Sequence, residues 1–94
     1  MFVVVADIKI KPESLSDFKQ WFSEANKVVS KFDGFVSRRL LETKDGQHRV
    51  LVEFENLEKF GKMHQNPEHE ELHRKATSFM AEPQSPKFYN VVAQ

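Results

Sequence analysis

Apolar residues recur with two different periods along this chain, and the change of period marks the expected elements. Residues 2–11 open as an apolar run and then alternate isoleucine with lysine, which predicts a strand that Pro12 ends. A helix of about five turns should follow, capped by Ser14 or Ser16, because apolar residues then return every three or four positions. These positions are Leu15, Phe18, Phe22, Ala25, Val29 and Phe32. Gly34 is the expected stop, since glycine tolerates the left-handed conformation at helix ends.

A hairpin is the next expected unit. Residues 35–42 and 48–54 read as two strands on either side of Lys44-Asp45-Gly46, a sequence typical of tight turns. Apolar and polar residues alternate along the second of these strands, so one face of the sheet should be wetter than the other.

Asparagine residues mark the beginnings of two more helices. Asn56 should cap a helical region that carries Leu57, Phe60 and Met63. Asn66 as cap and a proline at the first helical position should begin another helix, which runs to about residue 79.

The last expected element is a strand at residues 88–93, preceded by a linker that Pro83 and Pro86 bracket. The complete order is then β-α-β-β-α-β. This order predicts an α+β, ferredoxin-like fold, in which one antiparallel sheet carries helices on one face.

Composition narrows the class of protein. A chain of 94 residues predicts one domain, residues 1–94, and the absence of cysteine removes disulfides and thiolate zinc sites as supports for its core. Small domains without such supports often gain stability by oligomerising, so we expect a homodimer. The 14 basic and 14 acidic residues balance, which argues against a nucleic-acid partner. With no basic N-terminal flank and no apolar run of about 20 residues, we expect a soluble, cytoplasmic protein without a membrane partner.

Candidate chemistry concentrates in residues 63–73, which hold three of the 4 histidines, His64, His69 and His73. Imidazole titrates near neutral pH and binds metals, so it is suited to proton transfer and to ligation. Residues 69–73 also spell H-E-x-x-H, the string of a zinc protease. The preceding Asn-Pro pair, however, places His69 in the first turn of its helix, whereas that motif belongs inside a long helix beside a substrate cleft. We therefore interpret the match as coincidence and expect no metal.

The helical spacing of these histidines predicts which way they point. His69, Leu72, His73 and Ala76 share one face, because such spacings return to the same side of a helix. Two of the four are apolar, so this face should turn toward the sheet. A histidine at the border of a core is more often a structural hydrogen-bonding residue than a catalyst, and both interpretations stay open.

Several short motifs follow one another in a specific order and spacing. They are the opening V-V-V-A-D-I-K-I-K-P, F-K-Q-W-F on the first helix, G-F at 34–35, V-L-V-E-F-E at 50–55, F-x-x-M-H-x-N-P-x-H at 60–69, and P-K-F-Y-N-V-V near the end. Together they resemble the antibiotic biosynthesis monooxygenase (ABM) domain family over nearly the whole chain, and its small quinol-monooxygenase-like members most closely. The resemblance implies a homodimeric α/β barrel with a pocket between each sheet and its helices.

The same resemblance implies a monooxygenase that oxidises an electron-rich phenol or quinol with O₂ and needs no cofactor. Such chemistry requires a base to deprotonate the phenol, and an apolar cavity that keeps the resulting radical pair away from water. We expect His69 to be the base or a substrate-orienting donor, with His64 as the second choice. The expected substrate contacts are Trp21, Phe22, Phe60, Met63 and His73, although most aromatic side chains in a small domain simply fill its core. Arg38 or Arg39 is a candidate for orienting an anionic substrate.

Two alternatives stay open. A heme-degrading branch of the same family uses an axial histidine that His73 matches in position, so heme is the alternative cofactor. That branch also uses a tryptophan and an asparagine where this chain carries Met63 and Ala6, which weakens the case for ring cleavage. The second alternative is a non-catalytic dimeric binding or stress-response module, because this fold hosts many functions.

Overall fold

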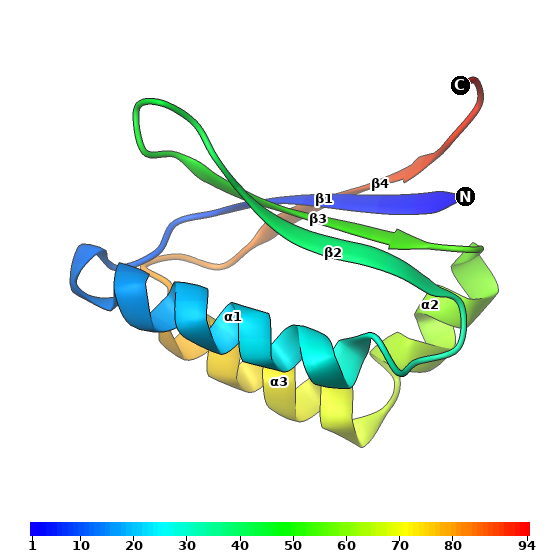
Figure 1. Cartoon of the computed structure of the whole chain (residues 1–94), viewed down its shortest axis with the longest axis horizontal. Helices are drawn as coiled ribbons and strands as arrows, with labels where there is room; N and C mark the ends of the chain where they lie inside the picture. The colour runs from blue at the N-terminus through cyan, green and yellow to red at the C-terminus, as the bar shows by residue number, and fades with distance from the viewer.

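The computed structural model describes all of residues 1–94, and it consists of a four-stranded sheet with helices on one of its faces (Figure 1). In chain order the elements are β1 (Phe2–Ile8), the single-turn 3₁₀ helix η1 (Pro12–Ser14), α1 (Leu15–Val29), β2 (Phe35–Glu42), β3 (His48–Phe54), α2 (Leu57–His64), α3 (Pro67–Ser78) and β4 (Ser85–Asn90). None of the helices has the length and apolar character that crossing a membrane requires.

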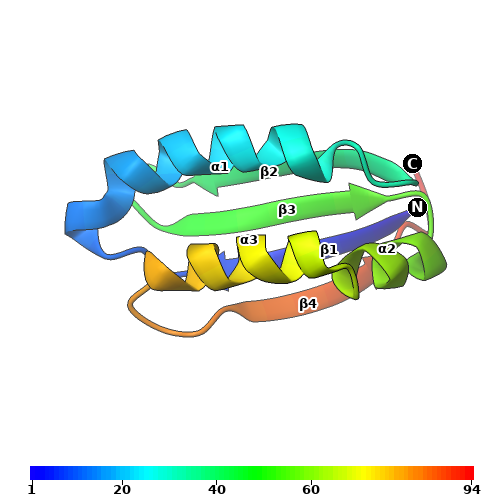
Figure 2. The ribbon, with the colours of Figure 1, turned by 90° about the horizontal axis from the view of Figure 1, so that it is seen from below.

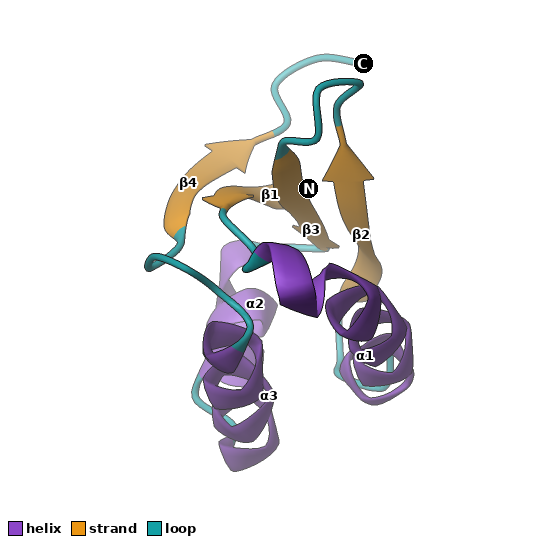
Figure 3. Ribbon diagram, turned by 90° about the vertical axis from the view of Figure 1, so that its left-hand side faces the viewer, coloured by secondary structure: helices purple, strands orange, loops and turns teal.

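The strands lie in the order β2-β3-β1-β4, and every neighbouring pair is antiparallel. The helices α1 and α3 lie along the same face of the sheet, and α2 lies at the end where α3 begins (Figures 2 and 3). Alternate residues of the inner strand β1 are buried, namely Phe2, Val4, Ala6 and Ile8. This arrangement confirms the predicted α+β, ferredoxin-like fold.

Side-chain hydrogen bonds cap the N-termini of α2 and α3, as the sequence predicts. The side-chain oxygen of Asn56 accepts a hydrogen bond from the backbone N–H of Lys59 at 2.9 Å, and that of Asn66 accepts one from Glu68 at 2.8 Å. Each bond satisfies a backbone donor that has no partner within its helix. Gly34 lies in the turn between α1 and β2 with a φ of +83°, the left-handed conformation expected of it, although α1 itself ends earlier, at Val29.

The predicted start of the first helix after Ser14 is confirmed, but its side-chain cap and its predicted end are wrong. Ser14 occupies the N-cap position without a side-chain hydrogen bond, because the 3₁₀ turn η1 leads directly into the helix. Ser16 lies inside α1, and Phe32 lies in the turn that follows its last residue, Val29. The backbone turn thus replaces the side-chain cap that the sequence suggested.

The predicted last strand is also misplaced. β4 begins at Ser85 and ends at Asn90, so Pro86 lies inside it rather than in a linker. Proline is tolerated there because β4 is an edge strand that pairs only with β1. The early start matters for the cavity, since it adds Pro86 to the face of the sheet that carries Phe88 and that the helices cover.

The layer between the sheet and the helices has two different ends. Where α1 begins and α3 ends, the rings of Phe18, Trp21 and Phe79 contact one another with centroids 5.8, 5.6 and 5.7 Å apart, and Met80 is buried with them. We call this cluster of Phe18, Trp21, Phe79 and Met80 the packed end. Where α3 begins, the same layer encloses a cavity instead.

Candidate functional site

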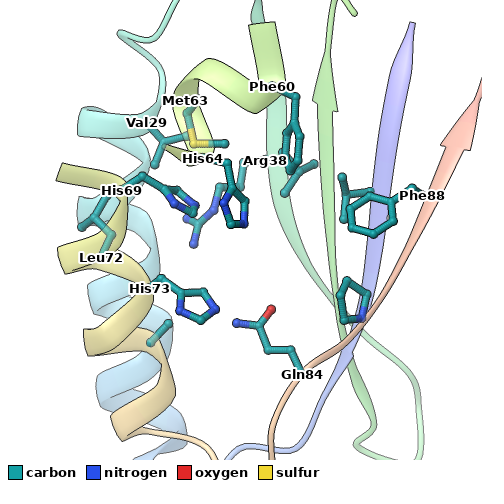
Figure 4. Close-up of a pocket in the computed structure, with 14 residues that line it drawn as sticks. Val29, Arg38, Phe60, Met63, His64, His69, Leu72, His73, Gln84 and Phe88 are labelled. Atoms are coloured by element: carbon teal, nitrogen blue, oxygen red, sulfur yellow. The ribbon is translucent and has the colours of Figure 1, made fainter. Parts of the chain in front are cut away.

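The cavity has a volume of about 130 Å³ and lies between the sheet and the helices (Figure 4). Strand register builds its floor, because Val4 of β1 pairs with both Val52 of β3 and Phe88 of β4. Arg38 of β2 pairs with Val52 in turn, so one row of side chains crosses all four strands. The helices supply apolar walls, which are Val29, Phe60, Met63, Leu72 and Ala76. Residues far apart in the sequence therefore line one small and mostly apolar chamber.

Three imidazoles line the cavity from the helix side. His64 is the last residue of α2, and His69 and His73 lie one turn apart on α3. The ring centroids of His64 and His69 are 4.9 Å apart, and those of His69 and His73 are 6.2 Å apart. The structure thus brings together all three histidines of the predicted segment, and His69 is the middle one.

The other acidic and histidine groups lie away from this cluster. Glu70 of the H-E-x-x-H string pairs with Arg74 at 3.4 Å on the exposed side of α3. The fourth histidine, His48, lies on β3 outside the cavity wall, with its Nε2 2.6 Å from a carboxylate oxygen of Glu42. No group of three or more His, Asp or Glu side chains has the geometry to hold a metal ion.

His69 is half-buried, and its pKa is lowered from 6.5 to about 4. Burial is the largest cause, since removal from water disfavours the charged imidazolium. The neighbouring His64, His73 and Arg38 lower the pKa further by repelling the added proton, and a hydrogen bond with the backbone of His64 opposes them only in part. At neutral pH, His69 is therefore an uncharged imidazole that can accept a proton.

Arg38 brings a permanent positive charge to the cavity wall. Its guanidinium carbon lies 3.9 Å from the centroid of the Phe22 ring, and its Nη1 donates a hydrogen bond to Oδ1 of Asn26 at 2.6 Å. Asn26 in turn donates from Nδ2 to the backbone carbonyl of Arg38 at 2.8 Å. Burial lowers the pKa of Arg38 to about 10, which leaves the group protonated at neutral pH.

The remaining residues that the sequence suggested divide into two groups. Phe60 and Met63 line the cavity. Trp21 does not, because it belongs to the packed end, and Phe22 lies beneath the Arg38 guanidinium instead of on the wall. Arg39 points to the opposite face of the sheet, where it pairs with Glu53 at 3.1 Å.

The sequence analysis did not name several contributors to the site. Among them, Phe88 and Gln84 come from β4 and the segment before it, and Asn26 comes from α1 and holds Arg38 in place. Phe88 lies in the strand that the sequence predicted, so the pairing of that strand with β1 was the signal that could have indicated it. No comparable signal points to Gln84 or Asn26, since their roles depend on how distant segments meet.

Comparisons with known proteins agree with this fold. The model of the antibiotic biosynthesis monooxygenase family matches residues 1–75. No curated protein matches the sequence significantly. Among solved structures, a variant of SnoaB, a cofactor-independent oxygenase from Streptomyces nogalater, superposes with a TM-score of 0.87 at 12% identity, over 99% of this chain and 94% of that one.

Two further solved structures are assigned as antibiotic biosynthesis monooxygenases. The protein from Nitrosomonas europaea has a TM-score of 0.85 at 14% identity and covers 99% of this chain and 100% of its own. The protein from Caulobacter crescentus has a TM-score of 0.84 at 20% identity, over 98% and 90% of the two chains. At such identities the likeness concerns the fold, and it extends over nearly the whole length of each chain.

Proposed function

The chain belongs to the antibiotic biosynthesis monooxygenase family, and on this premise we propose that it oxidises a single-ring phenol or quinol with O₂, without a cofactor, in the histidine-lined cavity. The composition of the cavity wall supports the proposal. Apolar side chains surround three imidazoles and one guanidinium, and no carboxylate lines the cavity. SnoaB, which shares the fold, is a cofactor-independent oxygenase.

The volume of the cavity favours a substrate of about one aromatic ring. An engineered apolar cavity of about 150 Å³ in another protein binds benzene. The cavity here is of similar size, at about 130 Å³, and it has polar groups on one side that can hold a hydroxyl.

The proposed reaction balances without an external reductant. Neutral His69 takes the hydroxyl proton, and the phenolate passes one electron to O₂, which gives a phenoxyl radical and superoxide. These join at a ring carbon to form a peroxide, to which His69 returns its proton. Loss of water from the ring carbon and the peroxide leaves a carbonyl, so the product is a quinone that holds one oxygen atom of O₂. The other oxygen atom leaves as water.

The cavity walls suit the steps that follow deprotonation. Phe60, Met63 and Leu72 offer no donors to superoxide, and their apolar surface limits the contact of the radical pair with water. The positive charge of Arg38 stabilises the phenolate, since an opposite charge in a partly buried site favours the ionised form. His64 and His73 flank the base and are placed to orient the ring through hydrogen bonds.

The reaction is tested by oxygen uptake with 1,4-dihydroxybenzene under ¹⁸O₂, with the rate of autoxidation subtracted. We expect enzyme-dependent uptake and one ¹⁸O atom per product, measured by mass spectrometry after immediate reduction of the quinone to prevent exchange with water. His69→Ala should lower kcat/KM by a factor of about 10² to 10⁴, the usual contribution of a general base.

The matched control is His48→Gln, because His48 is the histidine outside the cavity and the change should leave turnover unaltered. Product without ¹⁸O above the autoxidation background would contradict the monooxygenase proposal. Equal turnover by the parent and His69→Ala would instead remove His69 as the base.

The open face of the sheet supports a homodimer. Val3, Val5 and Leu51 are only half-buried there, and Leu41 and Tyr89 are 42% and 48% exposed. An apolar sheet face of this kind is stabilised when a second copy covers it. We expect the purified chain to sediment as a dimer at micromolar concentration, and Leu51→Glu to sediment as a monomer. A monomeric parent would contradict the dimer without touching the cavity chemistry.

The structure gives less support to heme as the ligand. His73 does line the cavity, but the volume of about 130 Å³ lies well below that of pockets for drug-sized ligands, which is about 300–1,000 Å³. A porphyrin needs a pocket at least that large. A hemin titration of the parent and of His73→Ala, followed in the Soret region, separates the two proposals, because only axial ligation would depend on His73.

A further inference from the structure

Arg38 has no acidic partner, unlike the other arginines of the chain. Arg39, Arg49 and Arg74 each form an ion pair with a carboxylate, and all of them are exposed. Arg38 is half-buried, and its side-chain contacts are the amide of Asn26 and the ring of Phe22. Removing a charge from water without a counter-charge is unfavourable, and no carboxylate of the protein offsets this cost.

The unpaired guanidinium faces the cavity. A guanidinium carries five N–H donors, and Asn26 accepts from only one of its nitrogens. No buried side-chain nitrogen of the molecule lacks a hydrogen-bond partner. The nitrogens of Arg38 that have no partner are therefore accessible to solvent, and Arg38 lines the cavity. Figure 4 shows the guanidinium beside the imidazoles of His64 and His69 at the inner side of the chamber.

The surroundings reinforce the preference for an anion. Every titratable side chain on the cavity wall is a base, namely Arg38, His64, His69 and His73. Arg38 carries a permanent positive charge, which in a partly buried site is screened less than on the surface, and no acidic side chain of the wall opposes it, so the chamber favours a negative ligand. Asn26 and Phe22 hold the guanidinium in one orientation, which leaves less side-chain entropy to lose on binding.

We propose that Arg38 is a specificity residue and that the ligand of the cavity is a single-ring hydroxyaromatic acid, whose carboxylate pairs with the free edge of the guanidinium. This inference rests on the proposed function and narrows it from phenols and quinols in general to those that carry an anionic group before any proton is removed. A carboxylate matches the planar fork of arginine, whereas a neutral amide of the same shape leaves the charge uncompensated.

The contribution of the ligand's negative charge is measured with two ligands of equal size, 2,5-dihydroxybenzoate and 2,5-dihydroxybenzamide. Their affinities are measured by isothermal titration calorimetry on the whole chain without O₂, so that no turnover occurs. The parent should bind the benzoate more tightly by a factor on the order of 10 to 100, as expected for a hydrogen bond to a charged group.

The matched variants are Arg38→Gln and Arg39→Gln, which remove neighbouring arginines that point to opposite faces of the sheet. Arg38→Gln should abolish the preference for the benzoate, and Arg39→Gln should preserve it. If Arg38→Gln does not fold, Arg38→Lys retains a positive charge without the fork, and it should keep a weaker preference. Equal binding of both ligands by the parent, or an undiminished preference in Arg38→Gln, would overturn the inference.

The outcomes separate this inference from the proposed function. Oxygen uptake that is equally efficient with the benzamide and the benzoate, combined with equal binding, would leave the monooxygenase standing and remove the acid specificity. A preference for the benzoate that Arg38→Gln abolishes, without any oxygen uptake, would support Arg38 as the specificity residue of a binding site and contradict the oxygenase.

Discussion

The packed end and the cavity end occupy the same layer between one sheet and the same helices, yet they are built from different residues. At the packed end, aromatic rings fill the space, and Phe18 is only 1% exposed. At the cavity end, the side chains that meet are histidines and an arginine, and the space of about 130 Å³ between them is left open. One end is organised for cohesion and the other for a ligand.

This contrast teaches how a small domain keeps polar groups in a mostly apolar cavity. The cavity end leaves a positive charge without a counter-charge, which reduces stability, and a half-buried base with a lowered pKa, which reduces stability only below pH 6.5. Burial of aromatic surface at the packed end stabilises the fold by several kcal/mol, roughly 25 cal/mol for each Å². Substitutions at the packed end should therefore lower mainly stability, and substitutions at the cavity end should lower mainly turnover or binding.

The largest expected effect is at the packed end. Phe18→Ala should lower the free energy of unfolding by about 3–5 kcal/mol, because it removes a fully buried ring and leaves a void against Trp21 and Phe79. Urea unfolding followed by far-UV circular dichroism measures the change. The fraction that remains folded should still prefer the benzoate over the benzamide.

The control for Phe18→Ala is His69→Ala, which truncates a side chain at the cavity end. His69 is half-buried beside open space, so its loss should change stability by less than the loss of Phe18 while it lowers turnover far more. Comparable losses of stability for both variants would contradict the view that the packed end stabilises the fold and the cavity end serves the reaction.

The fold could be predicted from the sequence because its signals are local. The caps at Asn56 and Asn66 and the turn at Gly34 act within a few residues, and the alternation along β1 repeats at every second position. The misplaced β4 shows the limit of this reasoning. Whether Pro86 ends a strand or lies on an edge depends on its neighbour across the sheet, which no local pattern contains.

The site could be predicted only in part, for a related reason. His69 and His73 lie one turn apart on one helix, so helical geometry sufficed to place them on one face, whereas His64 lies on α2 and only the folded chain brings it beside them. Arg38 was one of two adjacent arginines, and only the register with Val52 places it on the helix side of the sheet. Trp21 lies at the packed end and not on the cavity wall, and its position on α1 alone does not tell which end of the layer it fills.

An intermediate effect on stability is expected when pH is lowered, because of His69 at the cavity end. His69 has a pKa of about 4 in the folded chain, against 6.5 ordinarily. Between these values the unfolded chain binds a proton that the folded chain does not, so stability should fall as pH drops from 6.5 to 4 and should not change on this account outside that window. We expect a loss on the order of 1–2 kcal/mol, less than the full shift would give, because the imidazole is partly exposed to water.

The difference between the parent and His69→Gln in urea unfolding at pH 7 and pH 5 isolates this contribution from the other titrating groups. Nuclear magnetic resonance of the imidazole side chains gives the pKa directly and follows His64 and His73 in the same spectra. Titration of His69 near 6.5 in the folded protein would show that the cavity does not desolvate it, and the window of pH sensitivity would then disappear.

The smallest effect that still distinguishes the two ends is expected at Asn26. Asn26→Ala removes the hydrogen bond from Arg38 at 2.6 Å and the bond to the carbonyl of Arg38 at 2.8 Å, which join α1 to β2. Stability should fall by about 1–2 kcal/mol, since one of the two bonds involves a charged donor. Ser23→Ala, an exposed change on the same helix, should stay within about 0.5 kcal/mol of the parent.

Ligand binding to Asn26→Ala distinguishes the orientation of the Arg38 guanidinium from its charge. Without Asn26 the guanidinium keeps its charge but loses the contact that fixes its direction, so the preference for 2,5-dihydroxybenzoate over the benzamide should shrink without vanishing. Arg38→Gln, which removes the charge itself, should abolish it. If Asn26→Ala left the preference intact, Asn26 would serve only to join α1 to β2, and the direction of Arg38 would be set by its contact with the ring of Phe22.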